Sequence, residues 1–148
     1  MRTFNRILIF TLAFALLTAC GPKATSTPAV ILHVDNPYAP QVSDSALMRG
    51  EVKIDSASLE LGGSQPPRVT LDFAYFQPTP CYQLRVEESP LDAQNRINVS
   101  AYAVAEKDKA CTLMALATPL QANLDLGSFP QGHYSVWLNG SEVGEFDS

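Results

Sequence analysis

Residues 69–75 read Val-Thr-Leu-Asp-Phe-Ala-Tyr, and every second side chain in this stretch is large and apolar. A period of two brings alternate side chains to one face of a β-strand. The stretch therefore predicts a strand that turns Val69, Leu71, Phe73 and Tyr75 toward a core. The following Gln-Pro-Thr-Pro, residues 77–80, is typical of a turn.

The same alternation recurs on both sides of this strand. Residues 82–87 and 97–103 predict two further strands, each with one apolar and one polar or small-residue phase. Residues 117–126 predict a weaker one, because Pro119 favours an edge or the start of a strand. Residues 51–61 alternate with a phase slip between Ile54 and Ala57, as a β-bulge would produce.

Asn139-Gly140 predicts a hairpin near the C-terminus. Apolar residues alternate before it, at Tyr134, Val136 and Leu138, and return after it at Val143 and Phe146. Both central residues of a type I′ turn need positive φ, which Asn and Gly tolerate best. Together the segments predict an all-β fold, an antiparallel β-sandwich of about seven strands with no long helix.

Residues 126–134 read Leu-Gly-Ser-Phe-Pro-Gln-Gly-His-Tyr. This stretch resembles the L-x-P-x-G-x-Y neighbourhood of fibronectin-III-like and other immunoglobulin-like domains, with Phe129 before the proline. The resemblance implies an immunoglobulin-like sandwich in which Tyr134 forms a corner by bonding its hydroxyl to upstream backbone. It implies a fold and no particular function, because such sandwiches host many activities.

The N-terminus has the layout of a signal peptide. Arg2 and Arg6 precede an apolar run, residues 7–19, that is shorter than the roughly 20 residues a membrane-spanning helix needs. The run ends in Leu-Thr-Ala-Cys, residues 17–20, which resembles the lipobox of bacterial lipoproteins. The resemblance implies cleavage before Cys20 and a diacylglycerol thioether on its sulfur. The alternative is an ordinary cysteine behind a conventional signal peptide.

These patterns divide the chain into three parts. Residues 1–19 are expected to be a cleaved signal peptide, and residues 20–29 a lipidated cysteine with a Pro-, Ser- and Thr-rich tether. Residues 30–148 are expected to form one sandwich domain. The predicted location is the cell envelope, with the protein lipid-anchored to a membrane and facing the periplasm or the exterior. Which membrane holds it stays open.

Charge argues against a nucleic-acid partner. Without Arg2 and Arg6 the mature chain has eight basic residues against fifteen acidic ones, which gives a net charge of about −7. Binding to a polyanion needs clustered Lys and Arg. The densest basic stretch, residues 107–109, is interrupted by an aspartate.

The three cysteines separate into an anchor and a pair. If lipid occupies Cys20, as the lipobox implies, Cys81 and Cys111 remain as an even pair in an oxidising compartment. We therefore expect a disulfide that closes a loop of about thirty residues. The rival interpretation is a metal or nucleophile pair, but two cysteines thirty residues apart in a chain with two histidines do not form a zinc-ligand spacing.

No residue pattern predicts catalysis, a cofactor or a metal site. His33 and His133 have no cysteine or carboxylate at ligand spacing beside them. The serines near His133 lack a G-x-S-x-G pattern. The neighbouring Glu87 and Glu88 point to opposite faces of a strand, so they do not form an acid–base pair. We expect a protein that is not an enzyme.

Trp137 is the main candidate binding residue. The register that buries Tyr134 and Leu138 turns Trp137 outward together with His133. If the strand after Cys81 lies beside it, Arg85 stacks under the indole in a cation–π contact, and this structural role competes with a ligand site. A second outward apolar patch is also expected, formed by Phe76, Tyr102 and Val104.

Two functional hypotheses follow. The favoured one is a non-catalytic envelope module that binds a protein, a glycan or a peptide, or shapes a larger assembly, and it expects a contiguous apolar patch around Trp137. The alternative is a small inhibitor or enzyme-accessory domain, because immunoglobulin-like folds that resemble bacterial protease inhibitors use end loops as wedges. The proline-containing loops 62–68 and 77–81 are its candidates.

Overall fold

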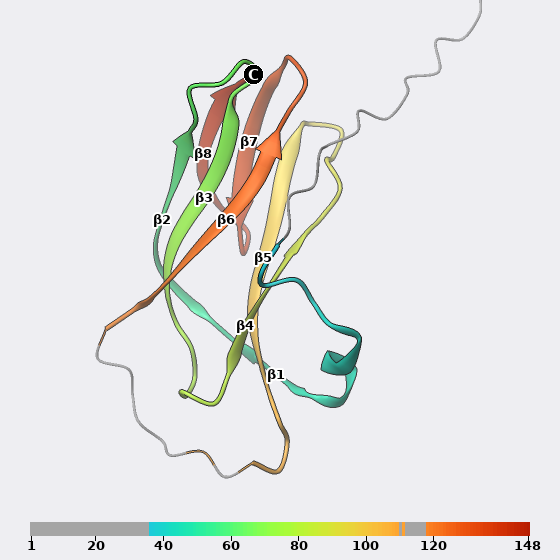
Figure 1. The fold of residues 1–148 in the computed structure, drawn as a ribbon, viewed down its shortest axis with the longest axis vertical. Helices are drawn as coiled ribbons and strands as arrows, with labels where there is room; N and C mark the ends of the chain where they lie inside the picture. The colour runs from blue at the N-terminus through green and yellow to red at the C-terminus, as the bar shows by residue number, and fades with distance from the viewer. Residues whose placement is uncertain (1–35, 110, 112–117) are drawn as a thin grey trace, which may run out of the picture.

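The computed structural model describes residues 36–109, 111 and 118–148, which form a β-sandwich (Figure 1). The described strands are β1 (Met48–Glu51), β2 (Lys53–Leu61), β3 (Arg68–Phe76), β4 (Gln83–Glu88), β5 (Arg96–Ala105), β6 (Leu120–Ser128), β7 (His133–Leu138) and β8 (Ser141–Asp147). A short 3-10 helix, η1 (Val42–Ala46), precedes β1. The all-β sandwich is confirmed, with eight strands in two sheets. The predicted signal peptide, Cys20, the tether and residues 30–35 lie outside the described residues.

The stretch that predicts the fold is the central strand of the smaller sheet. That sheet has the order β2-β3-β6. Val69, Leu71, Phe73 and Tyr75 are all buried in the core cluster, as their period of two predicts. The predicted bulge is present as a register shift between Ile54 and Ser56. Strand β6 starts directly after Pro119 and lies at the sheet edge, which confirms both expectations for that proline.

Strand β5 organises the larger sheet. It pairs with β4 along one side, and β7 and β1 share its other side. The pairing of β5 with β7 is parallel, which departs from the antiparallel expectation. After β5 the chain crosses to the smaller sheet, where it forms β6, and then returns to the larger sheet as β7. Such a crossover connection brings two strands side by side in the same direction.

The Asn139 side chain fills the gap that β7 and β1 leave along β5. The backbone N–H of Asn139 donates to the Val99 carbonyl at 2.9 Å. Its side-chain oxygen accepts from the Ala101 N–H at 2.7 Å, and its Nδ2 donates to the Ala101 carbonyl at 3.0 Å. Asn139 and Gly140 have φ of 49° and 81°, so the predicted hairpin turn is present as well.

Replacing Asn139 by glycine is expected to lower the free energy of unfolding by about 2 kcal/mol, because both buried backbone groups of Ala101 lose their partner. Glycine keeps the positive φ, so the change isolates the amide. Urea denaturation measures the loss, and hydrogen exchange of the Ala101 amide should accelerate. Asn95→Gly is the matched control, since Asn95 also has a positive φ, of 57°, in an exposed turn. An equal loss in both variants would contradict the role of the Asn139 amide.

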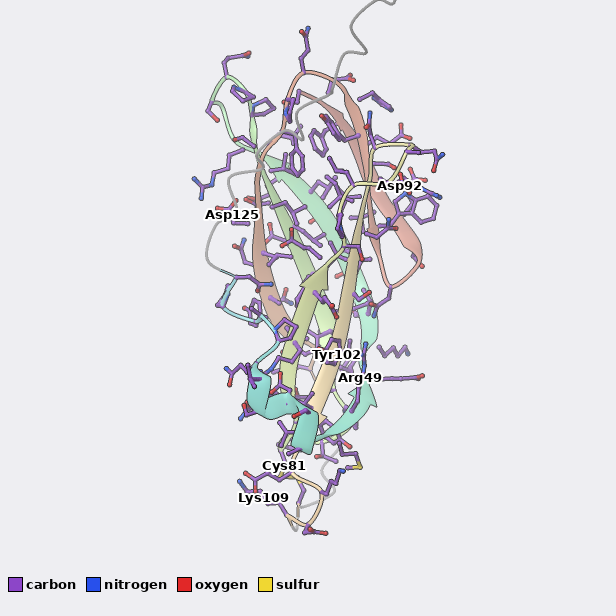
Figure 2. The ribbon with its side chains drawn as sticks, turned by 90° about the vertical axis from the view of Figure 1, so that its right-hand side faces the viewer. Arg49, Cys81, Asp92, Tyr102, Lys109 and Asp125 are labelled. Carbon is purple, nitrogen blue, oxygen red and sulfur yellow. A yellow bond between two sulfur atoms is a disulfide. The ribbon has the colours of Figure 1, made fainter. Side chains whose placement is uncertain are left out.

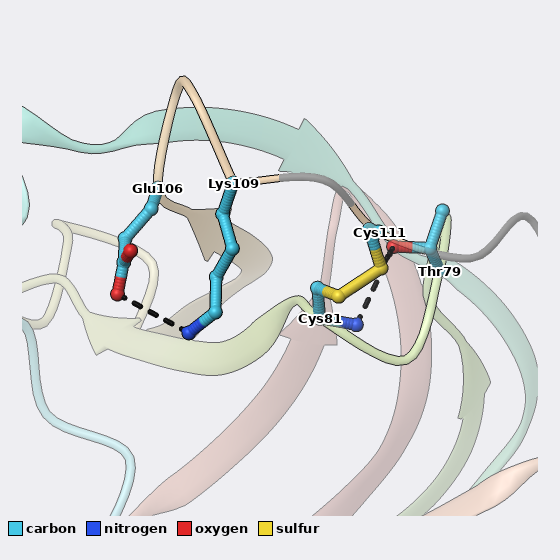
Figure 3. Close-up of a disulfide and its surroundings, with 5 residues drawn as sticks. All are labelled: Thr79, Cys81, Glu106, Lys109 and Cys111. Atoms are coloured by element: carbon cyan, nitrogen blue, oxygen red, sulfur yellow. Dashed lines mark hydrogen bonds and ion pairs between the residues drawn. A yellow bond between two sulfur atoms is a disulfide. The ribbon is translucent and has the colours of Figure 1, made fainter.

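Two features close opposite ends of the sandwich. The Tyr134 hydroxyl donates to the Pro130 carbonyl at 2.9 Å, the upstream bond that the tyrosine-corner resemblance implies, and the Tyr134 ring stacks on Phe146 with centroids 5.3 Å apart. At the other end Cys81 and Cys111 form the expected disulfide (Figure 3). Thr79 Oγ1 lies 3.0 Å from the Cys111 sulfur and ties the β3–β4 turn to the bridge.

Candidate binding surface

Trp137 lies on the outer face of the larger sheet and is held there by two contacts. Its Nε1 donates to Ser135 Oγ at 3.0 Å. The Arg96 guanidinium carbon lies 5.8 Å from the ring centroid, within the range of a cation–π contact. Tyr134, Val136 and Leu138 are buried on the opposite face of β7, so the period of two places the indole as predicted.

Arg85 does not stack under the indole, so the predicted pairing with Trp137 is wrong. Arg85 is buried, and its Nε and Nη2 donate to the Asp44 carboxylate at 2.7 and 3.0 Å. The reason is strand order: β4 and β7 lie on opposite sides of β5. The cation comes instead from β5, whose Arg96 is in register with Ser135.

The turn at residues 92–96 positions Arg96. The Asp92 carboxylate accepts from the Arg96 backbone N–H at 3.0 Å and from its Nε at 2.6 Å. The backbone bond from Arg96 is the first cause of a lowered Asp92 pKa. Asn95 has positive φ, and its Nδ2 donates to the His133 carbonyl at 3.3 Å. The turn that carries Arg96 is therefore held by the hydrogen bonds of Asp92 and Asn95.

His133 has two carboxylates beside it that residue spacing did not indicate. Its Nδ1 lies 2.9 Å from Asp147 and its Nε2 lies 3.4 Å from Glu145. Both acids are on β8, and the antiparallel pairing of β7 with β8 brings them to the histidine. Within the part of the chain that the structure describes, no three His, Cys, Asp or Glu side chains gather in a way that could hold a metal ion.

The hydrogen bond that His133 donates to the Asp147 carboxylate raises the pKa of His133 above 6.5, with Glu145 adding to the effect. We expect an NMR titration of the imidazole to give a midpoint above 6.5 and Asp147→Asn to bring it back toward that value. The protonated imidazole stabilises the folded state. This contribution is therefore complete below pH 6.5 and is lost as pH rises through the folded-state pKa. Glu145→Gln should produce a smaller shift, and a wild-type midpoint at or below 6.5 would refute the arrangement.

Two side chains of the second predicted apolar patch have the predicted orientation, but they are not exposed. Tyr102 and Val104 lie on the outer face, yet they are 9% and 3% exposed. The Arg49 guanidinium carbon lies 3.5 Å from the centroid of the Tyr102 ring (Figure 2). Phe76 is only half-buried. Among the described residues, the exposed large apolar side chains are Val42, Met48 and Leu61, and none of them is on β7 or its neighbours at Trp137.

The neighbours of Trp137 are instead polar. Asn98 on β5 and Glu142 on β8 are its register partners, and Ser135 and Arg96 complete the surroundings. The contiguous apolar patch that the binding hypothesis expected is therefore not found around the indole. The surface combines one aromatic ring with hydroxyl, amide, guanidinium and carboxylate groups.

Two hollows lie where the chain passes from β1 to β2 and so changes sheet. They have volumes of about 570 and 480 Å³, and both are lined by Val52 and Asn139. The larger one is also lined by Arg49, Glu51 and Tyr102. Figure 2 shows Arg49 and Tyr102 in the lower half of the molecule, whereas Asp92, beside Arg96, lies toward the other end. The larger hollow is therefore separate from the turn that carries Arg96, whereas the smaller one is also lined by Glu142, the register partner of Trp137 on β8.

The described part of the chain is a disulfide-bonded β-sandwich module. Residues 73–148, just over half of the chain, match the family described as ORF11 beta-sandwich domain, so the protein belongs to that family. The match covers β4 to β8 and the last four residues of β3. No curated protein and no solved structure matches the chain. No helix among the described residues is long and apolar enough to span a membrane.

Proposed function

We propose that this protein is a lipid-anchored component of a bacterial cell envelope whose sandwich is a non-catalytic binding module. Its ligand surface is the outer face around Trp137. The observation that carries this proposal is the indole held on the sheet by Ser135 and Arg96 among polar neighbours. A tryptophan already fixed in place loses little conformational freedom on binding, and tryptophan is a common anchor of binding surfaces.

The surroundings of the indole favour a glycan over an apolar protein surface. A sugar ring offers a C–H face to an aromatic ring and hydroxyl groups to amide, guanidinium and carboxylate partners. Asn98, Arg96 and Glu142 provide these three kinds of group next to Trp137.

The Tyr134 corner at the start of β7 also supports placing the sandwich among immunoglobulin-like domains.

The disulfide supports the envelope location. Disulfides persist in exported proteins and are rare in the cytosol. Because Cys81 and Cys111 are bonded to each other, Cys20 is the one cysteine left for lipid, at the end of a lipobox-like sequence. A residue that carries two or more acyl chains holds a protein firmly to a membrane.

Cys20→Ala tests the anchor. We expect the variant to lose labelling by radioactive palmitate and to move from the membrane fraction to the soluble fraction. A Cys81→Ala/Cys111→Ala variant is the matched control and should keep its label and its membrane location. The anchor assignment is wrong if Cys20→Ala remains membrane-bound and acyl-labelled.

Trp137 is the only tryptophan in the chain, so its fluorescence reports directly on the proposed surface. We expect soluble peptidoglycan fragments to change the emission of the unlipidated mature protein in a saturable manner. Asn98→Ala should weaken the effect, whereas Asn123→Ala, on β6 of the other sheet, should not. Unchanged emission across peptidoglycan fragments and other envelope glycans would exclude the glycan assignment.

No specific contact among the residues that the structure describes favours the inhibitor alternative. Loops 62–67 and 77–82 lie at opposite ends of β3 (Figure 1). A strand of nine residues separates its ends by about 30 Å, so the two loops do not form one wedge. Inhibition of a protease panel by the unlipidated mature protein would revive this alternative through one loop alone.

A further inference from the structure

Residues 36–47, here called the strap, run along the free edge of β4. The Val86 N–H donates to the Tyr38 carbonyl at 2.9 Å, and Asn36 Nδ2 donates to the Val86 carbonyl at 2.9 Å. In Figure 1 the strap passes β4 and ends in η1, next to the start of β1. These bonds satisfy the backbone of Val86, which would otherwise be free at the edge of the larger sheet.

An ion pair fastens the other end of the strap. Asp44 in η1 accepts two hydrogen bonds from Arg85, and the two side chains are only 10% and 7% exposed. Arg85 also donates to the Leu84 carbonyl at 3.0 Å and to Gln83 Oε1 at 3.3 Å, so its guanidinium is fixed to β4. Asp44, in η1, is the acidic partner that the strap contributes to this ion pair.

The strap buries little of itself. None of its residues is buried, and Val42 in η1 is 97% exposed. Tyr38 is its one side chain that packs, partly buried, against the core cluster. On the sheet face where Arg85 meets η1, Tyr102 and Val104 are almost completely buried. Hydrogen bonds and one ion pair, rather than buried apolar side chains, therefore hold the strap in place.

Segments with few buried apolar contacts open at lower free energy than the core. We propose that the strap is a releasable cover, which detaches from β4 as a unit while the two sheets stay folded. Release breaks the bonds at Val86 and Arg85 and uncovers the β4 edge together with the Arg85 side chain.

The position of the strap relates this opening to the proposed anchor. Chain segment 1–35 joins the domain through Asn36, so a pull from a lipid on Cys20 acts on the strap before it acts on the sheets. This mechanical link rests on the proposed function. The opening itself does not, because it depends only on the contacts of residues 36–47 with β4.

Native-state hydrogen exchange of the unlipidated mature chain tests the proposal. The Val86 amide reports on the strap directly, since it donates to Tyr38. We expect it to exchange through an opening that is more frequent than global unfolding and nearly independent of denaturant. The amides of β3, in the middle of the other sheet, should exchange only by global unfolding.

Asp44→Asn removes the negative charge of the strap and keeps the shape of the side chain. We expect Val86 exchange to become roughly tenfold faster, because a hydrogen bond to a charged group is lost, while β3 exchange stays unchanged. Asn36→Ala should also accelerate Val86 without touching the ion pair. Asp92→Asn, which weakens the Arg96 pair elsewhere, is the control and should leave Val86 unchanged.

Two results would overturn the proposal. One is a Val86 amide that exchanges in the wild-type protein only together with the β3 amides. The other is an Asp44→Asn variant that accelerates Val86 and β3 equally, which would mean that the strap and the sheets open as one unit. Neither result bears on the Cys20→Ala test, so the two proposals fail separately.

Discussion

Replacing Leu71 by alanine is expected to lower the free energy of unfolding by about 3 to 5 kcal/mol, the largest effect of any change considered. Leu71 is 0% exposed at the centre of β3. Its register partners are Leu59 on β2 and Leu124 on β6, so a row of three leucines crosses the sheet. Both neighbouring strands hold the backbone, which limits collapse of the cavity. Urea denaturation monitored by Trp137 fluorescence measures the loss.

Leu61→Ala is the matched control for this prediction. The chemical change is the same and Leu61 is in the adjacent strand β2, but its side chain is 52% exposed. We expect a loss below about 1 kcal/mol, because most of the removed surface already faces water. Equal losses for Leu61 and Leu71 would show that β3 is not the centre of the core.

Removing the disulfide is expected to have the second largest effect. Cys81 and Cys111 are separated by 30 residues. In the chain-entropy model a loop of this length contributes about 3 to 4 kcal/mol by restricting the unfolded chain. Cys81→Ala/Cys111→Ala should lose this amount in guanidinium denaturation, measured in a Cys20→Ala background that prevents new pairings.

Reductant provides the internal control for the disulfide prediction. It should destabilise the Cys20→Ala protein by a similar amount and leave the variant without Cys81 and Cys111 unchanged. A mass increase on alkylation that appears only after reduction would confirm the bridge in solution. If reductant leaves the stability of the Cys20→Ala protein unchanged, the predicted contribution of the loop is wrong.

Local patterns predicted much of the sandwich correctly. The alternation in residues 69–75 predicts the buried face of β3, and Asn139-Gly140 predicts the final hairpin. The phase slip after Ile54 predicts the bulge in β2. Each of these features depends on residues that are close in the chain, because side-chain alternation and turn φ angles are local properties.

The candidate surface could be predicted only in part. The period of β7 places Trp137 and His133 on the outer face, but it does not say which strands lie beside β7. The cation at the indole is Arg96 rather than Arg85, and the acids at His133 come from β8. Burial of Arg85 was missed for the same reason, since Asp44 reaches it from 41 residues away.

By itself, the sequence determined the strand periodicity, the two-cysteine pair, the hairpin and the lipobox-like N-terminus. The tertiary structure alone decided the parallel pairing of β5 with β7, the amide of Asn139 in the β5 ladder and the strap over β4. The physical reason is that strand order and register result from the packing of both sheets at once. A pattern of period two assigns side chains to a face, whereas only the assembled sheets decide which distant residues share it.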